Sequence, residues 1–277
     1  PALKKADIGV AMGITGTEVS KDAAVMILTD DNFATIVKAV EYGRGIYDNL
    51  AKSIRLQMTA LVAFIVPYVG AAFFFILGGV PFSPLVVLYI NFLVQVPIAI
   101  VLGYDKHLPG LMERKPRPLS QPVLSTSQWA RLIVIGLLVA LGTLYLELVY
   151  QPTDSSDLAG LALAATMGFA VFSFFNIAIG LSSRSETESV FQISNFTDRS
   201  QLILYGLAVV LTLLPTELGV TQRILGLVPL DLNQWLVCIG LAFALVLVYE
   251  VMKFFLRRSR SHGDAASTPV MAAASKA

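Results

Sequence analysis

The sequence predicts a mainly α-helical membrane protein, a polytopic bundle of six transmembrane helices preceded by a short α/β segment and a connecting helix. Apolar residues occupy 56% of the 277 positions and charged residues only 14%. The mean hydropathy is +0.72. Water-soluble proteins of this length rarely have such a composition, so the lipid bilayer is the expected solvent.

The N-terminal residues have the character of a water-soluble α/β unit. Two short apolar runs, Asp7–Met12 and Val25–Leu28, are bounded by Gly and Asp and are typical of buried strands. A helical turn is predicted between them at Glu18–Ala24. This alternation favours two parallel strands. Asp30 or Asp31 is suited to cap the helix that follows.

One long helix is predicted from Phe33 through Arg55 and into the first apolar span. Its apolar positions recur with the helical period: Phe33, Ile36, Val37, Val40, Tyr47, Leu50 and Ile54. A rigid helix could transmit displacement from the soluble segment to the membrane, which a Gly/Ser linker would not do. The pattern is equally compatible with a mere connector.

Six apolar stretches are long enough to cross a hydrocarbon core of about 30 Å, which takes about 20 helical residues. They are Leu56–Gly79, Phe82–Tyr104, Ala130–Tyr150, Leu158–Leu181, Leu202–Leu218 and Trp235–Leu256. The fifth is short and contains Pro215, which interrupts helical hydrogen bonding. Residues 257–277 are predicted to form a cytoplasmic tail that is first basic and then, from 261, disordered.

Lysine and arginine residues gather in alternate connections, and such connections face the cytoplasm in most membrane proteins. These residues are Lys106, Arg114, Lys115, Arg117 and Arg131, then Arg184 and Arg199, then Lys253, Arg257, Arg258 and Arg260. Because the number of spans is even, we expect both termini in the cytoplasm. We expect the membrane to be the plasma membrane.

Charge and cysteine content exclude several classes of protein. The formal net charge of +1 gives no basic field, so nucleic acid is not an expected partner. The single cysteine, Cys238, lies in an apolar run and can form no intrachain disulfide. His107 and His262 have no neighbouring ligands, so no resident metal site is expected.

Several motifs together point to a family. The closest resemblance is to the end of the phosphorylation domain and the following stalk of P-type cation ATPases, above all the type II pumps, which include the calcium and sodium/potassium pumps. The motifs that carry it are Pro1–Gly13 (PALKKADIGVAMG), Thr15–Lys21 (TGTEVSK), Leu28–Phe33 (LTDDNF) and Gly43–Asn49 (GRGIYDN). Met112–Pro118 (MERKPRP) is similar to the loop between the sixth and seventh membrane helices of that family.

The resemblance covers about residues 1–260 and implies a domain organisation. It implies a remnant of the phosphorylation domain at 1–32, a stalk helix at 33–55, a six-helix transmembrane domain at 56–256 and a tail at 257–277. The six spans would be the fifth to tenth helices of the family. We therefore expect a fragment, whose upstream part would hold the nucleotide-binding and actuator domains and the first four membrane helices.

The resemblance also implies which chemistry lies elsewhere. The phosphorylated aspartate would lie upstream of Pro1, so no catalytic or nucleotide-binding residue is expected in this chain. ATP and Mg²⁺ would be cofactors of the full-length pump, and none is expected in the fragment. Whether the chain counts as an enzyme stays open, since it alone should not hydrolyse ATP.

Candidate cation ligands follow from the second span, which resembles the sixth-helix motif of the family. In that motif an Asn, a Thr, an Asp and a nearby Pro surround the cation. Asn91 matches the Asn, Val94 replaces the Thr, Gln95 replaces the Asp, and Pro97 stands one residue early. Asn91 and Gln95 are four residues apart and share a helix face, and Pro97 frees a carbonyl nearby.

Further candidate ligands are Ser173 and Asn176 in the fourth span and Thr59 in the first. Ser173 takes the place of the acidic ligand of the calcium pumps, and Asn176 matches an Asn of that family. Polar residues at bilayer depth are costly and mark ion paths. These amides and hydroxyls could also serve only as packing contacts between helices, and Thr59 could bond only to its own backbone.

The transported ion stays undecided at this stage. No carboxylate lies at the middle of a predicted span, and calcium prefers several anionic oxygens, so a complete calcium site of the usual kind is not expected from these helices alone. A monovalent ion, a proton-linked process or a single calcium ion each stays open. Glu147 is expected near the outer end of its span, reaching the interface, and Glu250 is expected to pair with Lys253 or Arg257.

A second hypothesis belongs to another class. The chain could act alone as a non-enzymatic membrane protein, either a passive conduit or a subunit associated with a pump. The sequence immediately before Pro1 would discriminate the two, because the pump requires the end of a Gly-Asp-Gly-x-x-Asp motif there. The partners expected for the pump are the lipid bilayer, the transported cation and the upstream part of the same protein.

Overall fold

The computed structural model describes residues 1–105, 110–118, 120–154, 156–185, 189–191 and 198–267, with side chains as far as Arg258. It divides into two compact units, one formed by residues 1–48 with the described part of 106–121 and the other by the rest. In the described residues, six helices are long and apolar enough to cross a membrane. The predicted helical membrane architecture is therefore confirmed.

The first unit contains the predicted parallel strand pair. Its elements are α1 (Ala2–Lys5), β1 (Val10–Met12), α2 (Glu18–Ala23) and β2 (Met26–Leu28). The strands pair in parallel with Val10 opposite Met26. Thr17 begins α2, because its side chain accepts a hydrogen bond from the Ser20 N–H.

Asn32 caps the next helix, so the prediction of Asp30 or Asp31 is wrong. The Ala34 N–H donates to Asn32 Oδ1 at 3.0 Å. The two aspartates bind other groups: Asp30 accepts the Thr35 hydroxyl, and Asp31 accepts the N–H groups of Ile14 and Thr15. Asp31 adopts a positive φ of 48°, which aims its carboxylate back at the loop after β1.

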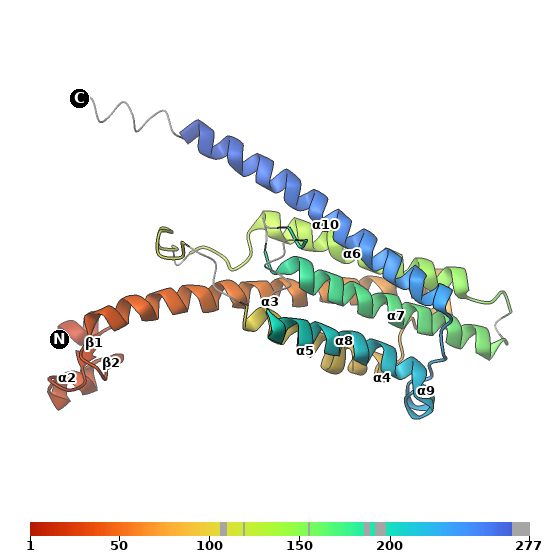
Figure 1. The fold of residues 1–277 in the computed structure, drawn as a ribbon, viewed down its shortest axis with the longest axis horizontal. Helices are drawn as coiled ribbons and strands as arrows, with labels where there is room; N and C mark the ends of the chain where they lie inside the picture. The colour runs from red at the N-terminus through yellow and green to blue at the C-terminus, as the bar shows by residue number, and fades with distance from the viewer. Residues whose placement is uncertain (106–109, 119, 155, 186–188, 192–197, 268–277) are drawn as a thin grey trace. The chain divides into compact units, whose positions relative to one another are not determined.

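The helix α3 (Phe33–Phe74) is continuous over 42 residues and runs from the first unit into the second (Figure 1). The predicted connection of the soluble segment to the first span by one helix is confirmed. The helix tolerates Pro67 in its interior and stops where Phe75 takes a left-handed conformation. A short turn, η1 (Ile76–Gly79), then leads to the next span.

The second unit is the helix bundle. After α3 it contains α4 (Pro84–Tyr89), the π-helical η2 (Ile90–Val94), α5 (Gln95–Gly103), α6 (Thr126–Tyr150), α7 (Leu158–Ser183), α8 (Arg199–Glu217), α9 (Gly219–Leu225) and α10 (Leu232–Ser267). Side-chain caps at Ser83, Ser125, Asp157 and Asp198 begin four of them.

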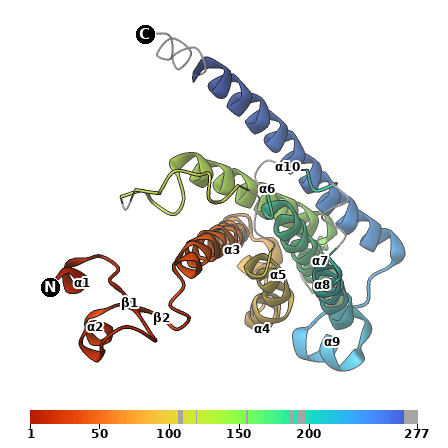
Figure 2. The same cartoon turned by 60° about the vertical axis from the view of Figure 1, so that its left-hand side comes forward.

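Helix α7 forms the centre of the bundle and contacts α5, α6, α8 and α10. Figure 2 shows α6, α7 and α8 side by side. The middle of α7 is buried without interruption from Thr166 to Asn176. Any polar side chain in this stretch is therefore held inside the protein and away from lipid.

Three boundaries differ from the sequence expectation. The second span is not one regular helix, since η2 interrupts it. A short helix, α9, follows the fifth span and was not predicted. Helix α10 continues to Ser267, beyond the predicted end of the sixth span at Leu256, and it contains no proline that would stop it. The disorder of the tail stays a prediction. Residues 268–277 lie outside the described part.

Candidate functional site

A hydrogen bond joins two of the predicted site residues, Gln95 and Asn176, across the bundle. Gln95 Nε2 donates to Asn176 Oδ1 at 2.9 Å, linking the start of α5 to the centre of α7. The exposed fractions of the two residues are 2% and 0%. The Asn176 amide also donates to the Phe172 carbonyl at 2.9 Å, which fixes its orientation. Two neutral amides thus meet in the dry interior.

The π-helical segment η2 positions Gln95. The Gln95 N–H bonds to the Ile90 carbonyl, five residues back, so this turn holds one residue more than an α-turn. Pro97 gives the physical reason, because it has no N–H and its ring would collide with the Leu93 carbonyl in a regular helix. Pro97 is itself buried. Because Pro97 has no N–H, one carbonyl of the preceding turn lacks its regular helical donor.

Ser173 lies three residues before Asn176 on α7 and is completely buried. Residues three apart on a helix share a face. The Ser173 hydroxyl has no hydrogen-bond partner among the described residues. An unsatisfied buried hydroxyl costs about 1–3 kcal/mol. This oxygen is therefore available to a ligand at the level of the amide pair.

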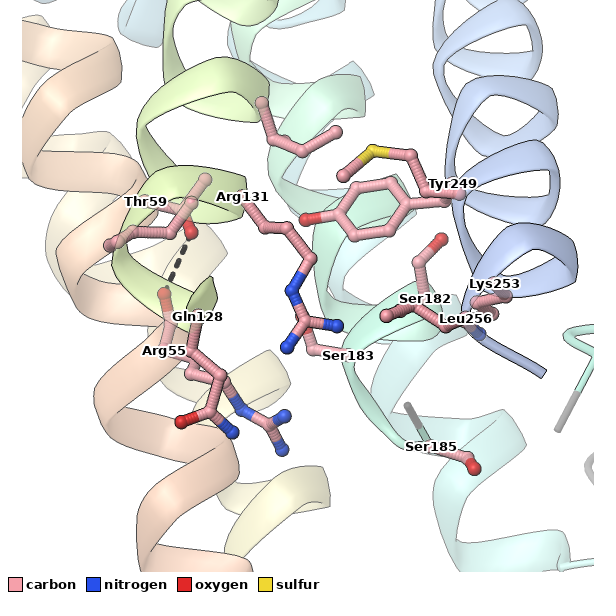
Figure 3. A pocket seen from close by; sticks show the side chains of 13 residues that line it. Arg55, Thr59, Gln128, Arg131, Ser182, Ser183, Ser185, Tyr249, Lys253 and Leu256 are labelled. Atoms are coloured by element: carbon pink, nitrogen blue, oxygen red, sulfur yellow. Dashed lines mark hydrogen bonds between the residues drawn. The ribbon is translucent and has the colours of Figure 1, made fainter. Parts of the chain in front are cut away.

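Asn91 and Thr59 bond to their own helices. The Asn91 amide donates to the Val87 carbonyl at 2.8 Å. The Thr59 hydroxyl donates to the Arg55 carbonyl at 2.8 Å, as Figure 3 shows. In the part of the chain that the structure describes, no hydrogen bond connects either residue to Gln95 or Asn176. The hydrogen bonds thus bring together only two of the five predicted residues.

Glu147 is completely buried, so the expectation that it reaches the interface is wrong. Its carboxylate occupies the space that a side chain at Gly168 of α7 would need. Neither carboxylate oxygen has a hydrogen-bond partner in the described residues. Burying an unpaired carboxylate is costly, and such groups in membranes are commonly functional. Only knowledge that Gly168 faces Glu147 could have revealed this arrangement from the sequence.

The carboxylate and the amide pair lie at different depths in the bundle. Gly168 and Asn176 are eight residues apart on α7, a separation of about 12 Å along the helix axis. Eight residues turn an α-helix through two turns and about 80°, so the two positions lie at opposite edges of one broad helix face. The bundle therefore holds two polar levels, one acidic and one neutral.

A third polar group, at the end of the bundle, was missed in the sequence. Asp105 accepts hydrogen bonds from Lys52 Nζ at 2.8 Å, Arg184 Nη2 at 3.0 Å and Gln201 Nε2 at 3.0 Å. The Asn49 amide adds a bond to the Asp105 carbonyl at 2.7 Å. We call these five residues the Asp105 cluster. It ties α3 to the ends of α5, α7 and α8.

The charge of Asp105 is stabilised inside this cluster. Burial by itself raises the pKa of the Asp105 carboxyl, but the hydrogen bonds and charges of Lys52 and then Arg184 outweigh it and lower the pKa below the ordinary 3.8. The carboxylate is therefore ionised at neutral pH and balances two buried cations. In the sequence, Arg184 indicated only the orientation of the spans.

The described residues contain no group of three or more His, Cys, Asp or Glu side chains able to hold a metal ion. At the level of Gln95 and Asn176, a cation would therefore be bound by neutral oxygens of amides, the Ser173 hydroxyl and backbone carbonyls. Such oxygens suit hard cations, and added anionic ligands strengthen the binding of divalent ones.

Residues 79–255 match the family described as "Cation transporting ATPase, C-terminus". The chain is 34% identical over 259 residues to calcium-transporting ATPase 1 of Schizosaccharomyces pombe, covering 93% of this chain and 28% of that protein. It is 34% identical over 266 residues to calcium-transporting ATPase 1 of Bacillus cereus, covering 91% and 30%. It is 32% identical over 258 residues to human calcium-transporting ATPase type 2C member 1, covering 91% and 27%. The chain thus spans less than a third of the length of these relatives.

Proposed function

We propose that this chain, which belongs to the P-type cation-transporting ATPases and forms their C-terminal membrane region, carries part of the ion path of an ATP-driven pump. The observation that carries the proposal is the buried hydrogen bond between Gln95 and Asn176 beside the π-turn. Polar side chains are rare at bilayer depth, and those that are buried there commonly belong to an ion path.

The cation would bind at the level of this pair. The oxygens of Gln95, Asn176 and Ser173 and a carbonyl of the π-turn near Pro97 would replace water around it. The amide–amide hydrogen bond would open when the cation enters, so the bond would represent the empty site. Asn91 and Thr59 would join only if their side chains left the backbone carbonyls that they now bond.

Calcium is the first candidate for the cation, because the relatives are named as calcium-transporting ATPases. A single calcium ion would need anionic ligands from the upstream part of the pump, since the described side chains at this level are neutral. A monovalent cation is the second candidate, and that same neutrality favours it.

The energy for cation transport would come from ATP hydrolysis in the upstream part of the pump. ATP and Mg²⁺ would act as cofactors of the full-length pump, where an aspartate upstream would take the phosphoryl group. Its movement would displace α3, and the Asp105 cluster would pass that displacement to the ends of α5, α7 and α8. Access to the cation site would then alternate between the two sides.

The first unit would contact the upstream nucleotide-binding and actuator parts of the same pump. Its apolar side chains Ile14, Val19 and Val25 are 73%, 80% and 75% exposed. A two-stranded sheet is too small to be stable alone, so these side chains would be covered by the rest of the phosphorylation domain. The first four membrane helices would pack against the bundle described above.

Both termini would lie in the cytoplasm. Arg55, Arg131, Arg184 and Lys253 lie toward the same end of the spans, and an excess of cations marks the cytoplasmic side. The plasma membrane stays a prediction. Protease protection in oriented vesicles would test the topology, since sites near the C-terminal tail should be cut only from the cytoplasmic side.

The test uses the full-length parent protein in sealed vesicles, with ATP-driven uptake measured for calcium, sodium, potassium, magnesium and protons. Gln95→Ala and Asn176→Ala should each lose uptake while phosphorylation by ATP is retained. Gln57→Ala is the matched control, because Gln57 is exposed on α3. Uptake with unchanged ion affinity in Gln95→Ala would remove this residue from the site. No uptake of any of these ions by the wild type would favour the non-enzymatic alternative.

A further inference from the structure

A small pocket separate from the proposed cation site lies between α3, α6, α7 and α10 (Figure 3). Its volume is about 70 Å³, enough for a phosphate-sized group. Three of its lining side chains are cationic, those of Arg55, Arg131 and Lys253, and none of the thirteen lining residues is acidic. The pocket is therefore a concentration of positive charge between helices.

Arg131 is the central side chain of this pocket. Figure 3 shows its guanidinium in the middle of the space, with Arg55 and Gln128 on one side and Tyr249 and Ser182 on the other. Its Nε donates to the Ser127 carbonyl at 3.2 Å, which holds the side chain in place. A guanidinium carries its N–H donors in a fixed fork, which suits two oxygens of one anion.

Ser182 supplies an independent sign of a ligand. Its exposed fraction is 1%, and it lines the pocket. Its hydroxyl has no hydrogen-bond partner among the described residues. A buried donor of this kind is costly to leave unsatisfied, and an anionic oxygen in the pocket would satisfy it. The nearest acidic residue by sequence, Glu250, lies 3.7 Å from Lys253 Nζ and is not itself a lining residue.

The pocket lies at the level of lipid head groups. Arg55 directly precedes the first predicted span, Arg131 lies in the second turn of α6 and Ser182 in the last turn of α7. Lys253 lies close to the Arg258 end of the candidate span in α10. All four helices thus contribute residues from the same end of their membrane-spanning parts, where the hydrocarbon core gives way to head groups.

Part of the pocket wall is apolar. Leu132, Ile135, Met252 and Leu256 line the pocket together with the cations. A freely dissolved anion gains nothing from such walls, whereas a lipid places its phosphate against the cations and the start of its acyl chains against the aliphatic side chains. A lipid therefore contacts both the cationic and the aliphatic side chains of the lining.

We propose that this pocket binds the phosphate-bearing head group of an anionic phospholipid. The phosphate accepts hydrogen bonds from Arg131, Arg55 and Ser182, and Lys253 adds charge. The lipid bridges α3, the helix that would transmit motion, to α6, α7 and α10. The inference does not depend on the cation-site proposal, because no residue of the Gln95–Asn176 pair lines this pocket.

The experiment uses the complete chain purified in detergent and transferred to phosphatidylcholine nanodiscs with and without phosphatidylglycerol. Native mass spectrometry then measures how many molecules of each lipid stay bound. Phosphatidylglycerol should be retained in preference to phosphatidylcholine. Arg131→Gln and Lys253→Gln should each weaken that retention about fivefold, the effect of one cation near a lipid surface. Ser182→Val, which keeps the charge and removes the hydroxyl, should weaken it to a smaller extent.

Arg223→Gln is the matched control, because Arg223 is exposed on α9 and lies outside the pocket. It should leave retention unchanged. Equal retention in wild type, Arg131→Gln and Ser182→Val would overturn the proposal. The thermal midpoint gives a second test. If inorganic phosphate added to discs of pure phosphatidylcholine raises the midpoint as much as phosphatidylglycerol does, the occupant is a free anion and the proposal is overturned. If Arg131→Gln fails to fold, the Ser182→Val comparison decides.

Discussion

The Lys52 ammonium lies 2.8 Å from the Asp105 carboxylate, and the two side chains are only 5% and 6% exposed. Arg184 holds the other carboxylate oxygen at 3.0 Å. A charge surrounded in this way is fixed, since each partner would be left unpaired if another moved. This pair therefore joins the part of α3 that enters the bundle to the residue that ends the second span.

Removing the charge of Asp105 should destabilise the bundle. Asp105→Asn removes the carboxylate that Lys52 and Arg184 bind, and removing one partner of a buried ion pair costs about 3–5 kcal/mol. Unfolding in mixed micelles, followed by circular dichroism, would measure the loss. Asp7→Asn, at an exposed position of the first unit, is the control and should change little. A loss below about 1 kcal/mol in Asp105→Asn would contradict the assigned role.

The stabilisation that Asp105 contributes should depend on pH, and the same variant tests this. The pKa of the Asp105 carboxyl is lower in the folded protein than its ordinary value of 3.8, so the stabilisation is fully present above that pH. It is lost as the pH falls through the lowered pKa. The difference in unfolding free energy between wild type and Asp105→Asn should be constant near neutrality and shrink in acid. A difference that grows in acid would have the wrong sign.

Helix α6 approaches α3 so closely at Gly136 that no side chain fits. A Cβ atom at this position would lie 2.8 Å from Val62 Cβ and 3.1 Å from the Thr59 carbonyl oxygen. Gly136→Ala should therefore cost about 1–3 kcal/mol through overpacking. Gly206→Ala is the control, because nothing lies within 4 Å of its added Cβ. It should be neutral or stabilising, since alanine is the better helix former. Equal effects of both changes would refute close packing at Gly136.

The buried carboxylate of Glu147 should serve function at the expense of stability. Glu147→Gln keeps the shape and removes an ionisable group whose charged form is costly to bury, so the thermal midpoint should rise or stay the same. Cation uptake by the full-length protein should fall, because an intramembrane carboxyl can bind a cation or a proton and an amide cannot be ionised. Glu217→Gln, exposed at the end of α8, should change neither. Normal uptake in Glu147→Gln would leave this carboxylate without a part in transport.

Asp31 should control the loop after β1. Its carboxylate accepts the Ile14 N–H at 2.9 Å and the Thr15 N–H and hydroxyl at 2.7 Å. In Asp31→Ala, the amides of Ile14 and Thr15 should exchange with deuterium faster than in wild type. Asp22→Ala, exposed on α2, should leave their exchange unchanged. Unaltered exchange in Asp31→Ala would show that the loop is held by other contacts.

Features that depend on local chemistry could be predicted from the sequence. The six spans follow from apolar length, and the strands around Ala11 and Ile27 follow from short apolar runs between Gly and Asp. Gln95 and Asn176 are candidates because polar residues are costly at bilayer depth and because their spans resemble motifs of the cation ATPases. Their direct hydrogen bond joins positions 81 residues apart, and spacing alone gives no such distance.

The features that were missed depend on contacts between distant segments. The partners of Asp105 lie 53, 79 and 96 residues away in the sequence, so Asp105 looked like an ordinary loop residue after the second span. Glu147 looked like an interfacial residue because it stands three positions from the end of α6. Its burial depends on Gly168, and which face of α7 opposes α6 cannot be read from either helix alone.

The π-turn at Ile90–Val94 sets which way the rest of the second span faces. Each residue of an α-helix turns the chain by about 100°, so winding the same residues as a regular α-helix would rotate everything beyond the turn by that angle. The span would keep its hydrophobicity and still cross the bilayer. The Gln95 side chain, however, would no longer face α7, so a change too small to alter the topology would remove its partner Asn176.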